Sequence, residues 1–201
     1  IFLKKNISHN DFLIMLYGNE NVLKNELTKQ NIKTNKVKIV HTDSVVSDEE
    51  TPLTAIKNSK NTSMWSSIRS QVEGEADISL SAGNTGVLFV ISKMILKMMP
   101  EVAKPALAGL WPSKKGMSVV LDLGANIECD EKNLVDFSEM GAALYKSIFP
   151  QQKPYVSLLN IGSEEIKGTD VLKKTFSKLK DLSDDKNFLF NGYIEGNSLM
   201  D

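Results

Sequence analysis

The stretch Asp-Ile-Ser-Leu-Ser-Ala-Gly-Asn-Thr-Gly, residues 77–86, decides the fold class. Residues 77–81 are predicted to form a buried strand. The glycine-rich loop Ser81–Gly86 follows, and a strongly apolar helix is predicted over residues 85–99, ending at Pro100. A strand that passes through a glycine loop into a helix is the repeating unit of α/β domains, so this loop is predicted to be an active-site loop of an α/β enzyme.

The same alternation continues on both sides of this stretch. Further helices are indicated by helical faces and by helix-start signals, such as Thr51 followed by Pro52. Strands are predicted at residues 12–17, 37–41, 77–81, 106–111, 118–123, 155–160 and 188–190, and helices at 20–30, from 52, 64–72, 85–99, 132–149 and 170–182. This order predicts an α/β fold with a mostly parallel sheet covered by helices on both faces, in a single domain of residues 1–201.

Composition narrows the function classes. The 201 residues carry 24 Lys and Arg against 25 Asp and Glu, and this balance argues against a broad nucleic-acid surface. The single cysteine, Cys129, excludes an intrachain disulfide and favours a reducing, cytoplasmic setting. With only His9 and His41 beside it, no zinc site is expected, and no other cofactor is indicated.

Neither end of the chain reads like a complete protein. Residues 1–6 resemble the end of a helix, there is no initiator Met, and the last residues stop abruptly. We therefore expect a fragment of a longer protein. The longest apolar run, residues 87–99, is interrupted by Lys93 and Lys97 and is shorter than the roughly 20 residues that a spanning helix needs.

Three loops after predicted strands share a composition rich in glycine and asparagine. They are residues 82–86, residues 124–126 after a strand that carries Asp122, and residues 161–168, with residues 191–196 as a weaker fourth. Because ligands bind at the carboxyl ends of parallel strands, we expect the three loops to converge on one site.

An anion is the ligand that suits these loops. The helix that starts near Thr85 presents unpaired N–H groups and its positive dipole end, and Lys167 adds one full positive charge. Glycine lets a backbone approach a ligand closely, while asparagine offers amide donors. Neither a dinucleotide fingerprint nor a P-loop motif is present.

The remaining reactive side chains fit structural or solvated roles better. Cys129 lies between two acidic residues, which raise a thiol pKa. Ser81 has no G-x-S-x-G frame and no histidine partner, and His41 ends a predicted strand. Glu164 and Glu165 could act as an acid/base pair, although adjacent carboxylates on a loop are usually solvated.

Several motifs in order closely resemble the bacterial phosphate acyltransferase family of phospholipid synthesis (PlsX). They are Ser-Ala-Gly-Asn-Thr-Gly at residues 81–86, Asp-Leu-Gly-Ala-Asn at 122–126 and Asn-Ile-Gly-Ser-Glu-Glu-Ile-Lys-Gly at 160–168. Residues 60–64, 104–108 and 191–196 fit the family in the same order, so the resemblance runs from about residue 11 to the end.

The resemblance implies that inorganic phosphate attacks the thioester of a long-chain acyl–acyl-carrier protein, which gives acyl phosphate and free carrier protein. It also implies a three-layer α/β/α sandwich related to isopropylmalate dehydrogenase and phosphotransacetylase, a homodimer, and a cytoplasmic enzyme with peripheral association at the inner face of the cell membrane. On this basis the expected catalytic residues are Lys167, Asn160 and Asn84. The expected substrate- and phosphate-binding residues are Ser81, Gly83, Thr85, Gly86, Asp122, Gly124, Asn126 and Glu165.

The chain departs from the family pattern at three places. The family's Asp-Ala-Met-Gly-Gly-Asp and Asp-Gly-Phe-x-Gly-Asn motifs are absent, and Asn197 stands where members usually carry Arg. Two alternatives stay open: a phosphate acetyl- or acyltransferase that uses a coenzyme A thioester, and a non-enzymatic anion-binding regulatory protein. A dehydrogenase of the isopropylmalate type fits less well, because its metal-binding Asp pair and a nucleotide loop are not evident.

Overall fold

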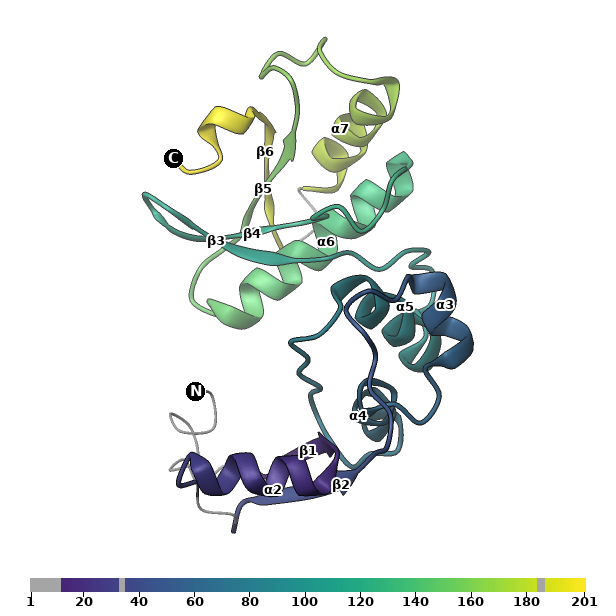
Figure 1. The fold of residues 1–201 in the computed structure, drawn as a ribbon. Helices are drawn as coiled ribbons and strands as arrows, with labels where there is room; N and C mark the ends of the chain where they lie inside the picture. Colours follow the sequence, from purple (N-terminus) through teal and green to yellow (C-terminus); the bar gives the residue numbers. More distant parts are fainter. Residues whose placement is uncertain (1–11, 33–34, 184–186) are drawn as a thin grey trace. The chain divides into compact units, whose positions relative to one another are not determined.

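The computed structural model describes residues 12–32, 35–183 and 187–201, and Figure 1 shows its elements. The chain divides into two compact units, Ile1–Lys97 and Met98–Asp201. Each unit has its own hydrophobic core and is described by itself. The helix end predicted at residues 1–6 lies outside the described residues.

The first unit opens with a β-α-β motif. Strand β1 (Ile14–Gly18) pairs in parallel with β2 (Val37–His41), with Ile14 opposite Val37. Helix α2 (Glu20–Lys29) makes the crossover that parallel neighbours require. It begins at Asn19, whose Oδ1 accepts hydrogen bonds from two N–H groups of the first turn. Both strands and this helix lie within two residues of their predicted bounds.

Three further helices form the core of the first unit. They are α3 (Pro52–Asn58), α4 (Ser63–Val72) and α5 (Thr85–Leu96). The predicted start of α3 is confirmed, since the Thr51 Oγ1 caps it by accepting a hydrogen bond from the Thr54 N–H. Their apolar faces meet in a cluster of Ala55, Met64, Ile68, Val87 and Ile91.

The prediction of a strand at residues 77–81 is wrong. This segment pairs with no strand in the described part of the chain, and the side chains of Ile78 and Leu80 are 75% and 70% exposed. A strand is stabilised by its neighbours rather than by its own sequence, so an apolar run without a partner stays irregular. The loop Ser81–Gly86 is thus entered from an exposed segment.

The second unit begins with a hairpin. Strand β3 (Gly109–Ser113) pairs antiparallel with β4 (Gly116–Val120) across a two-residue turn, so the predicted strands at 106–111 and 118–123 are shifted. A parallel connection needs a crossover of a dozen or more residues, and the chain has no room for one here. The short spacing between the two predicted strands already disfavoured a parallel pair.

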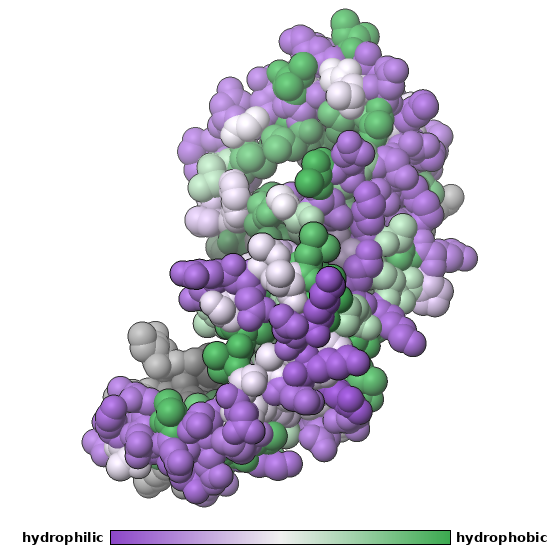
Figure 2. Space-filling model, turned by 45° about the vertical axis from the view of Figure 1, so that its right-hand side comes forward, coloured by the Kyte–Doolittle hydropathy of each residue, from purple (hydrophilic) through white to green (hydrophobic). Residues whose placement is uncertain are grey.

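A second β-α-β motif completes the unit. Strand β5 (Tyr155–Leu159) pairs in parallel with β6 (Leu189–Ile194), and α7 (Asp170–Leu182) makes the crossover. Helix α6 (Glu131–Ile148) packs beside α7. The core of the unit consists of Ala142, Leu158, Leu179, Phe188 and Tyr193. Figure 2 shows hydrophobic residues gathered around an opening in this unit.

The predicted loop at residues 191–196 is mostly strand. Strand β6 runs four residues beyond its predicted end at Phe190, and only Glu195 lies between it and the short 3-10 helix η1 (Gly196–Ser198). Gly192, with φ of 76°, lies where the register between β5 and β6 shifts. A glycine in this conformation lets a strand continue through a bulge.

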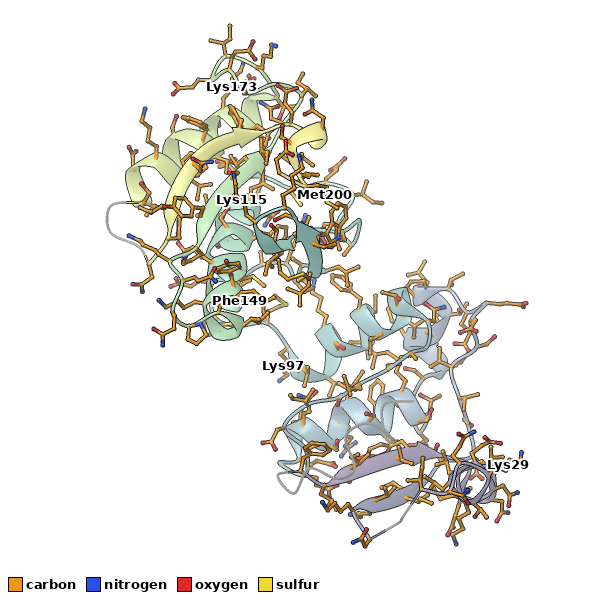
Figure 3. All side chains as sticks on the ribbon, turned by 90° about the vertical axis from the view of Figure 1, so that its left-hand side faces the viewer. Lys29, Lys97, Lys115, Phe149, Lys173 and Met200 are labelled. Carbon is orange, nitrogen blue, oxygen red and sulfur yellow. The ribbon has the colours of Figure 1, made fainter. Side chains whose placement is uncertain are left out.

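The first unit ends with α5. The helix stops at Leu96, three residues before its predicted end, because Lys97 has φ of 62° and leaves the helical path. Figure 3 labels Lys97 on the segment that follows the helix. Across the described residues, two of three strand pairs are parallel, and no helix has both the length and the apolar character needed to cross a membrane.

Candidate active site

Asn84 organises the first loop. Its Oδ1 accepts the Val87 N–H at 3.1 Å and caps α5, while its Nδ2 donates to the backbone carbonyls of Asp48 and Glu50 at 3.1 and 2.9 Å. Both amide protons are therefore used within the protein. The side chain fastens the acidic segment before α3 to the start of α5.

The N-terminus of α5 offers a site for an anion. Thr85 and Gly86 are exposed, and within the described residues their backbone N–H groups have no acceptor. Such groups add to the positive end of the helix dipole. A Cβ added at Gly86 would lie 3.3 Å from Pro52, and one at Gly83 would lie 3.3 Å from Met64, so glycine lets the loop lie close to α3 and α4.

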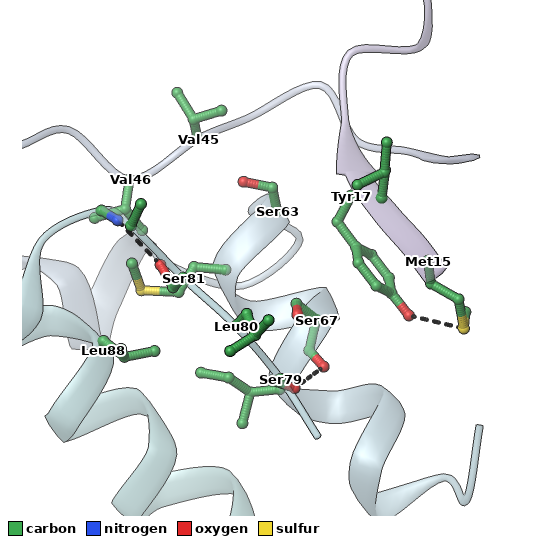
Figure 4. A pocket seen from close by; sticks show the side chains of 15 residues that line it. Met15, Tyr17, Val45, Val46, Ser63, Ser67, Ser79, Leu80, Ser81 and Leu88 are labelled. Carbon is green, nitrogen blue, oxygen red and sulfur yellow. Dashed lines mark hydrogen bonds between the residues drawn. The ribbon is translucent and has the colours of Figure 1, made fainter. Parts of the chain in front are cut away.

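Ser81 takes part in the same turn. Its Oγ accepts the Gly83 N–H at 3.2 Å, and it lines a cavity of about 300 Å³ in the first unit (Figure 4). This hydrogen bond joins Ser81 to Gly83 within the turn, directly before Asn84.

Asp122 organises the second loop. Its carboxylate accepts the N–H groups of Leu107, Ala125 and Asn126 at 3.0, 3.3 and 2.8 Å, and the Asn126 Nδ2 at 2.7 Å. Gly124, with φ of 77°, makes the turn between them. The carboxylate thus serves as the acceptor around which the loop folds.

The side-chain amide of Asn126, like that of Asn84, donates hydrogen bonds within the protein. Besides its bond to Asp122, its Nδ2 donates to the Pro105 carbonyl at 2.9 Å. Asp122 and Asn126 together tie the loop to residues 105–107, which sequence reasoning did not connect to the site. The sequence did contain one indication that this loop is closed by its own side chains, since an amide and a carboxylate lie four residues apart around a glycine.

Asn160 is buried at the start of the third loop. Its backbone N–H donates to Ile194, its Nδ2 donates to the Lys167 carbonyl at 3.2 Å, and its Oδ1 accepts the Ile161 N–H at 2.9 Å. Gly168 lies against this amide with φ of 93°, and a Cβ there would come within 2.6 Å of Oδ1. Asn160 therefore closes the loop from Lys167 back to β5.

Lys167 is held in place by Glu164. The Nζ lies 2.9 Å from Oε2, and the lysine side chain is 47% exposed. This hydrogen bond raises the pKa of Lys167 and lowers the pKa of Glu164, because each group stabilises the charged form of the other. A Cβ at Gly162 would overlap the Lys167 Cδ, so glycine leaves room for this lysine.

Glu165 lies apart from this ion pair. Its Oε1 is 3.8 Å from the Nζ of Lys180 on α7, and both side chains are 67% exposed. Burial raises the pKa of Tyr193 on β6, and the charge of Glu165 adds to that increase. The two neighbouring carboxylates thus have different partners, which does not favour a shared acid/base role.

Two further observations concern the cysteine and the residues that could bind a metal ion. Burial raises the pKa of Cys129, with Asp122 and Asp130 adding to it, which disfavours a thiolate nucleophile. In the residues that the structure describes, no group of three or more His, Cys, Asp or Glu side chains could hold a metal ion.

The three loops fall in different units. Residues 81–86 belong to the first unit, and residues 122–126 and 160–168 belong to the second. Their convergence on one phosphate remains a prediction, as do the roles of the individual residues.

Two solved structures share the fold of this chain. The chain matches a phosphotransacetylase from Staphylococcus aureus with a TM-score of 0.68 at 15% identity, over 96% of this chain and 64% of that one. It matches a phosphotransacetylase from Streptococcus pyogenes with a TM-score of 0.67 at 14% identity, over 96% and 71%. The chain therefore has the α/β fold of phosphotransacetylases, as its sequence predicted.

Sequence comparison shows which family the chain belongs to. A model of the family described as "Fatty acid synthesis protein" matches residues 3–201, and the chain belongs to that family. It is 49% identical to the phosphate acyltransferase of Pelagibacter ubique, over 96% of this chain and 57% of the relative. It is 41% identical to that of Parvibaculum lavamentivorans, over 96% and 53%. The predicted resemblance is confirmed, and the chain spans about half the length of these relatives.

Proposed function

We propose that the protein transfers a long-chain acyl group from acyl–acyl-carrier protein to inorganic phosphate, giving acyl phosphate for phospholipid synthesis. The observation that carries this proposal is the family membership of residues 3–201, together with relatives named phosphate acyltransferase. The fold and the three glycine loops are compatible with the reaction.

Phosphate can be the nucleophile without a catalytic serine or cysteine. Near neutral pH it is partly dianionic, like a phosphate monoester. The protein then has to hold the dianion beside the thioester carbonyl and stabilise the oxyanion that develops. Among the described residues, the N–H groups of Thr85 and Gly86 have no acceptor and suit the first task, and the Lys167 cation, which pairs with Glu164, suits either task.

Among the asparagines we assign positioning roles. The amide protons of Asn84 and Asn126 already donate to backbone or carboxylate oxygens, and the Asn160 amide holds the Lys167 loop. In this proposal they fix the loops whose backbone and lysine contact the substrates. Ser81, Asp122 and Glu165 have the same supporting role.

A thioester assay tests the proposal. Purified protein is incubated with palmitoyl–acyl-carrier protein, with and without phosphate, while free thiol and acyl phosphate are measured. Phosphate-dependent release of both products is expected. Thiol release that ignores phosphate would exclude the reaction, turnover of acyl-coenzyme A alone would favour that donor, and phosphate binding without turnover would favour a regulatory anion-binding protein.

The partners follow from the same proposal. We infer a homodimer, an acidic carrier protein as the acyl donor, no nucleic-acid partner, and a cytoplasmic location with peripheral contact to the membrane. Light scattering would test the dimer, and sedimentation with anionic phospholipid vesicles would test the membrane contact.

A further inference from the structure

Helix α7 directly follows the third loop and has two different sides. One side packs against α6 and β6, and Thr175 and Leu179 on this side are fully buried. Figure 1 shows α7 at the edge of the second unit, beside α6. The other side of the helix exposes four lysines, which are Lys173, Lys174, Lys178 and Lys180.

These lysines form two rows along one face of the helix. Side chains four residues apart lie one above the other, so Lys174 is in line with Lys178. Two full turns separate Lys173 from Lys180, which form the second row. Ser177 is exposed between the rows. Ser177 and the four lysines together are called the lysine face below.

The charge of the lysine face is only partly neutralised. The Nζ of Lys178 lies 3.5 Å from a carboxylate oxygen of Glu131, and that of Lys180 lies 3.8 Å from one of Glu165. The other two lysines form no ion pair among the residues that the structure describes. Exposed ion pairs contribute little to stability, so an acidic partner can compete for all four ammonium groups.

The lysine face starts beside the third loop. The Thr169 Oγ1 caps α7 by accepting an N–H of the first turn at 3.4 Å, so the helix begins three residues after Lys167. The two unpaired lysines therefore lie in the half of the helix that is next to this loop. The acidic residues of the helix, Asp170 and Asp181, lie in its first and last turns and leave the middle of the face to the lysines.

We propose that the lysine face docks the acidic acyl-carrier protein and so brings its thioester to the third loop. The inference rests on the proposed function and adds the place where the acyl donor binds. The whole chain has a formal net charge of -1, so lysines gathered on one helix face are a local feature rather than a general basic character. Such a patch steers the encounter with a protein of opposite charge and fixes its orientation.

An anionic membrane is the other surface that a row of lysines could attract. Helices that bind membranes insert apolar side chains beside their basic residues. The apolar side chains of α7 are used in the core of the unit, where Leu172 and Phe176 pack against the cluster that contains Leu179. The helix therefore offers charge alone, which favours a protein partner with matching carboxylates.

Charge reversal tests the docking face. The Kd of palmitoyl–acyl-carrier protein is measured for the double variant Lys173→Glu/Lys174→Glu at low and at high salt. We expect binding to weaken about tenfold or more at low salt, mainly through slower association, and the difference from wild type to shrink at high salt. The KM for phosphate should stay as in the wild type.

The matched control is the double variant Lys57→Glu/Lys146→Glu. It changes the net charge by the same amount, on exposed lysines in the last turns of α3 and α6. Lys146 is at the opposite end of α6 from Glu131, which contacts the lysine face. We expect this variant to change the Kd by less than about twofold, because charges far from an interface are screened by salt.

A gain of affinity gives a second test that misfolding cannot imitate. Ser177→Lys adds a positive charge between the two rows and should tighten binding about two- to threefold at low salt. Ser147→Lys on α6 is its control. Both serines are exposed, and each donates its hydroxyl to a carbonyl of the preceding helical turn, so the two substitutions disturb the helices alike.

Several outcomes would overturn the inference. They are an unchanged Kd in Lys173→Glu/Lys174→Glu, equal weakening by the control double variant, and equal tightening by Ser147→Lys and Ser177→Lys. Loss of sedimentation with anionic phospholipid vesicles, at unchanged carrier-protein affinity, would assign the face to a membrane instead. Charge-dependent binding of the carrier protein without phosphate-dependent turnover would count against the proposed reaction only.

Discussion

At the residue scale, Gly168 shows how the third loop depends on the absence of a side chain. With φ of 93° and the Asn160 amide within 2.6 Å of the position that a Cβ would take, alanine would meet both backbone strain and a clash. We expect Gly168→Ala to lower the free energy of unfolding by about 1–3 kcal/mol, measured by urea denaturation.

Gly124→Ala is the matched control for this prediction. Gly124 also has a positive φ, 77°, but nothing lies within 4 Å of its Cβ position. The loss of unfolding free energy in Gly124→Ala therefore measures backbone strain alone. The additional loss in Gly168→Ala measures the clash with Asn160. Equal costs would show that the close approach is relieved by a small shift of the amide.

Lys167 is the charged residue that the proposed reaction depends on most strongly. Since its cation would stabilise the phosphate or the developing oxyanion, Lys167→Ala should lower phosphate-dependent turnover by about 10²–10³, in the range seen when one such donor is removed. The measurement is the thioester assay, with circular dichroism to check the fold.

Lys29→Ala is a close control for that variant. Lys29 forms the same kind of exposed i,i+3 ion pair, 2.8 Å from Glu26, and this bond also raises its pKa. It lies on α2, away from the three loops in sequence, and its variant should keep wild-type turnover. Wild-type turnover in Lys167→Ala would remove that lysine from the site.

At the element scale, the start of α5 depends on Asn84 in two separable ways. Asn84→Ala removes the helix cap and both bonds to the acidic segment, whereas Asn84→Asp keeps an acceptor for the cap and loses the donors. We expect alanine to destabilise the first unit by about 1–2 kcal/mol through the cap alone, and more when the lost bonds are added.

The two variants are compared by hydrogen exchange in α5. If aspartate behaves like wild type, the bonds to Asp48 and Glu50 contribute nothing measurable. If aspartate is as costly as alanine, those bonds rather than the cap stabilise the loop.

At the scale of the whole molecule, the two units have separate cores. Ile91 and Leu179 are both fully buried, the first in the cluster of unit one and the second in that of unit two. Replacing either with alanine should cost about 2–5 kcal/mol. We expect exchange to accelerate mainly within the unit that carries the substitution, with α4 and α7 as reporters. Equal acceleration in both units would show that they unfold together.

The accuracy of the sequence-based predictions depended on the range of the interactions. Helices α2, α6 and α7 were placed within one residue at each end, because capping residues and apolar periodicity act over a few positions. The pairing of β3 with β4 was not predicted, and neither was the bulge that carries β6 through Gly192. The bulge depends on a neighbouring strand that local sequence does not specify, whereas the short connection between β3 and β4 already disfavoured a parallel pair.

The sequence by itself determined the family, the three glycine loops and the order of the elements apart from the strand predicted at residues 77–81, because these follow from local pattern and from motifs in order. Only the tertiary structure decided that the Asn84 and Asn126 amides are used within the protein, and that Lys167 is paired with Glu164. It also decided that residues 77–81 have no ladder partner within the described chain. The Asn84 bonds and the ladders join residues far apart in the chain, so they depend on which groups the fold brings within reach, whereas the Asn126 and Lys167 contacts span only four and three residues and depend on how each loop folds.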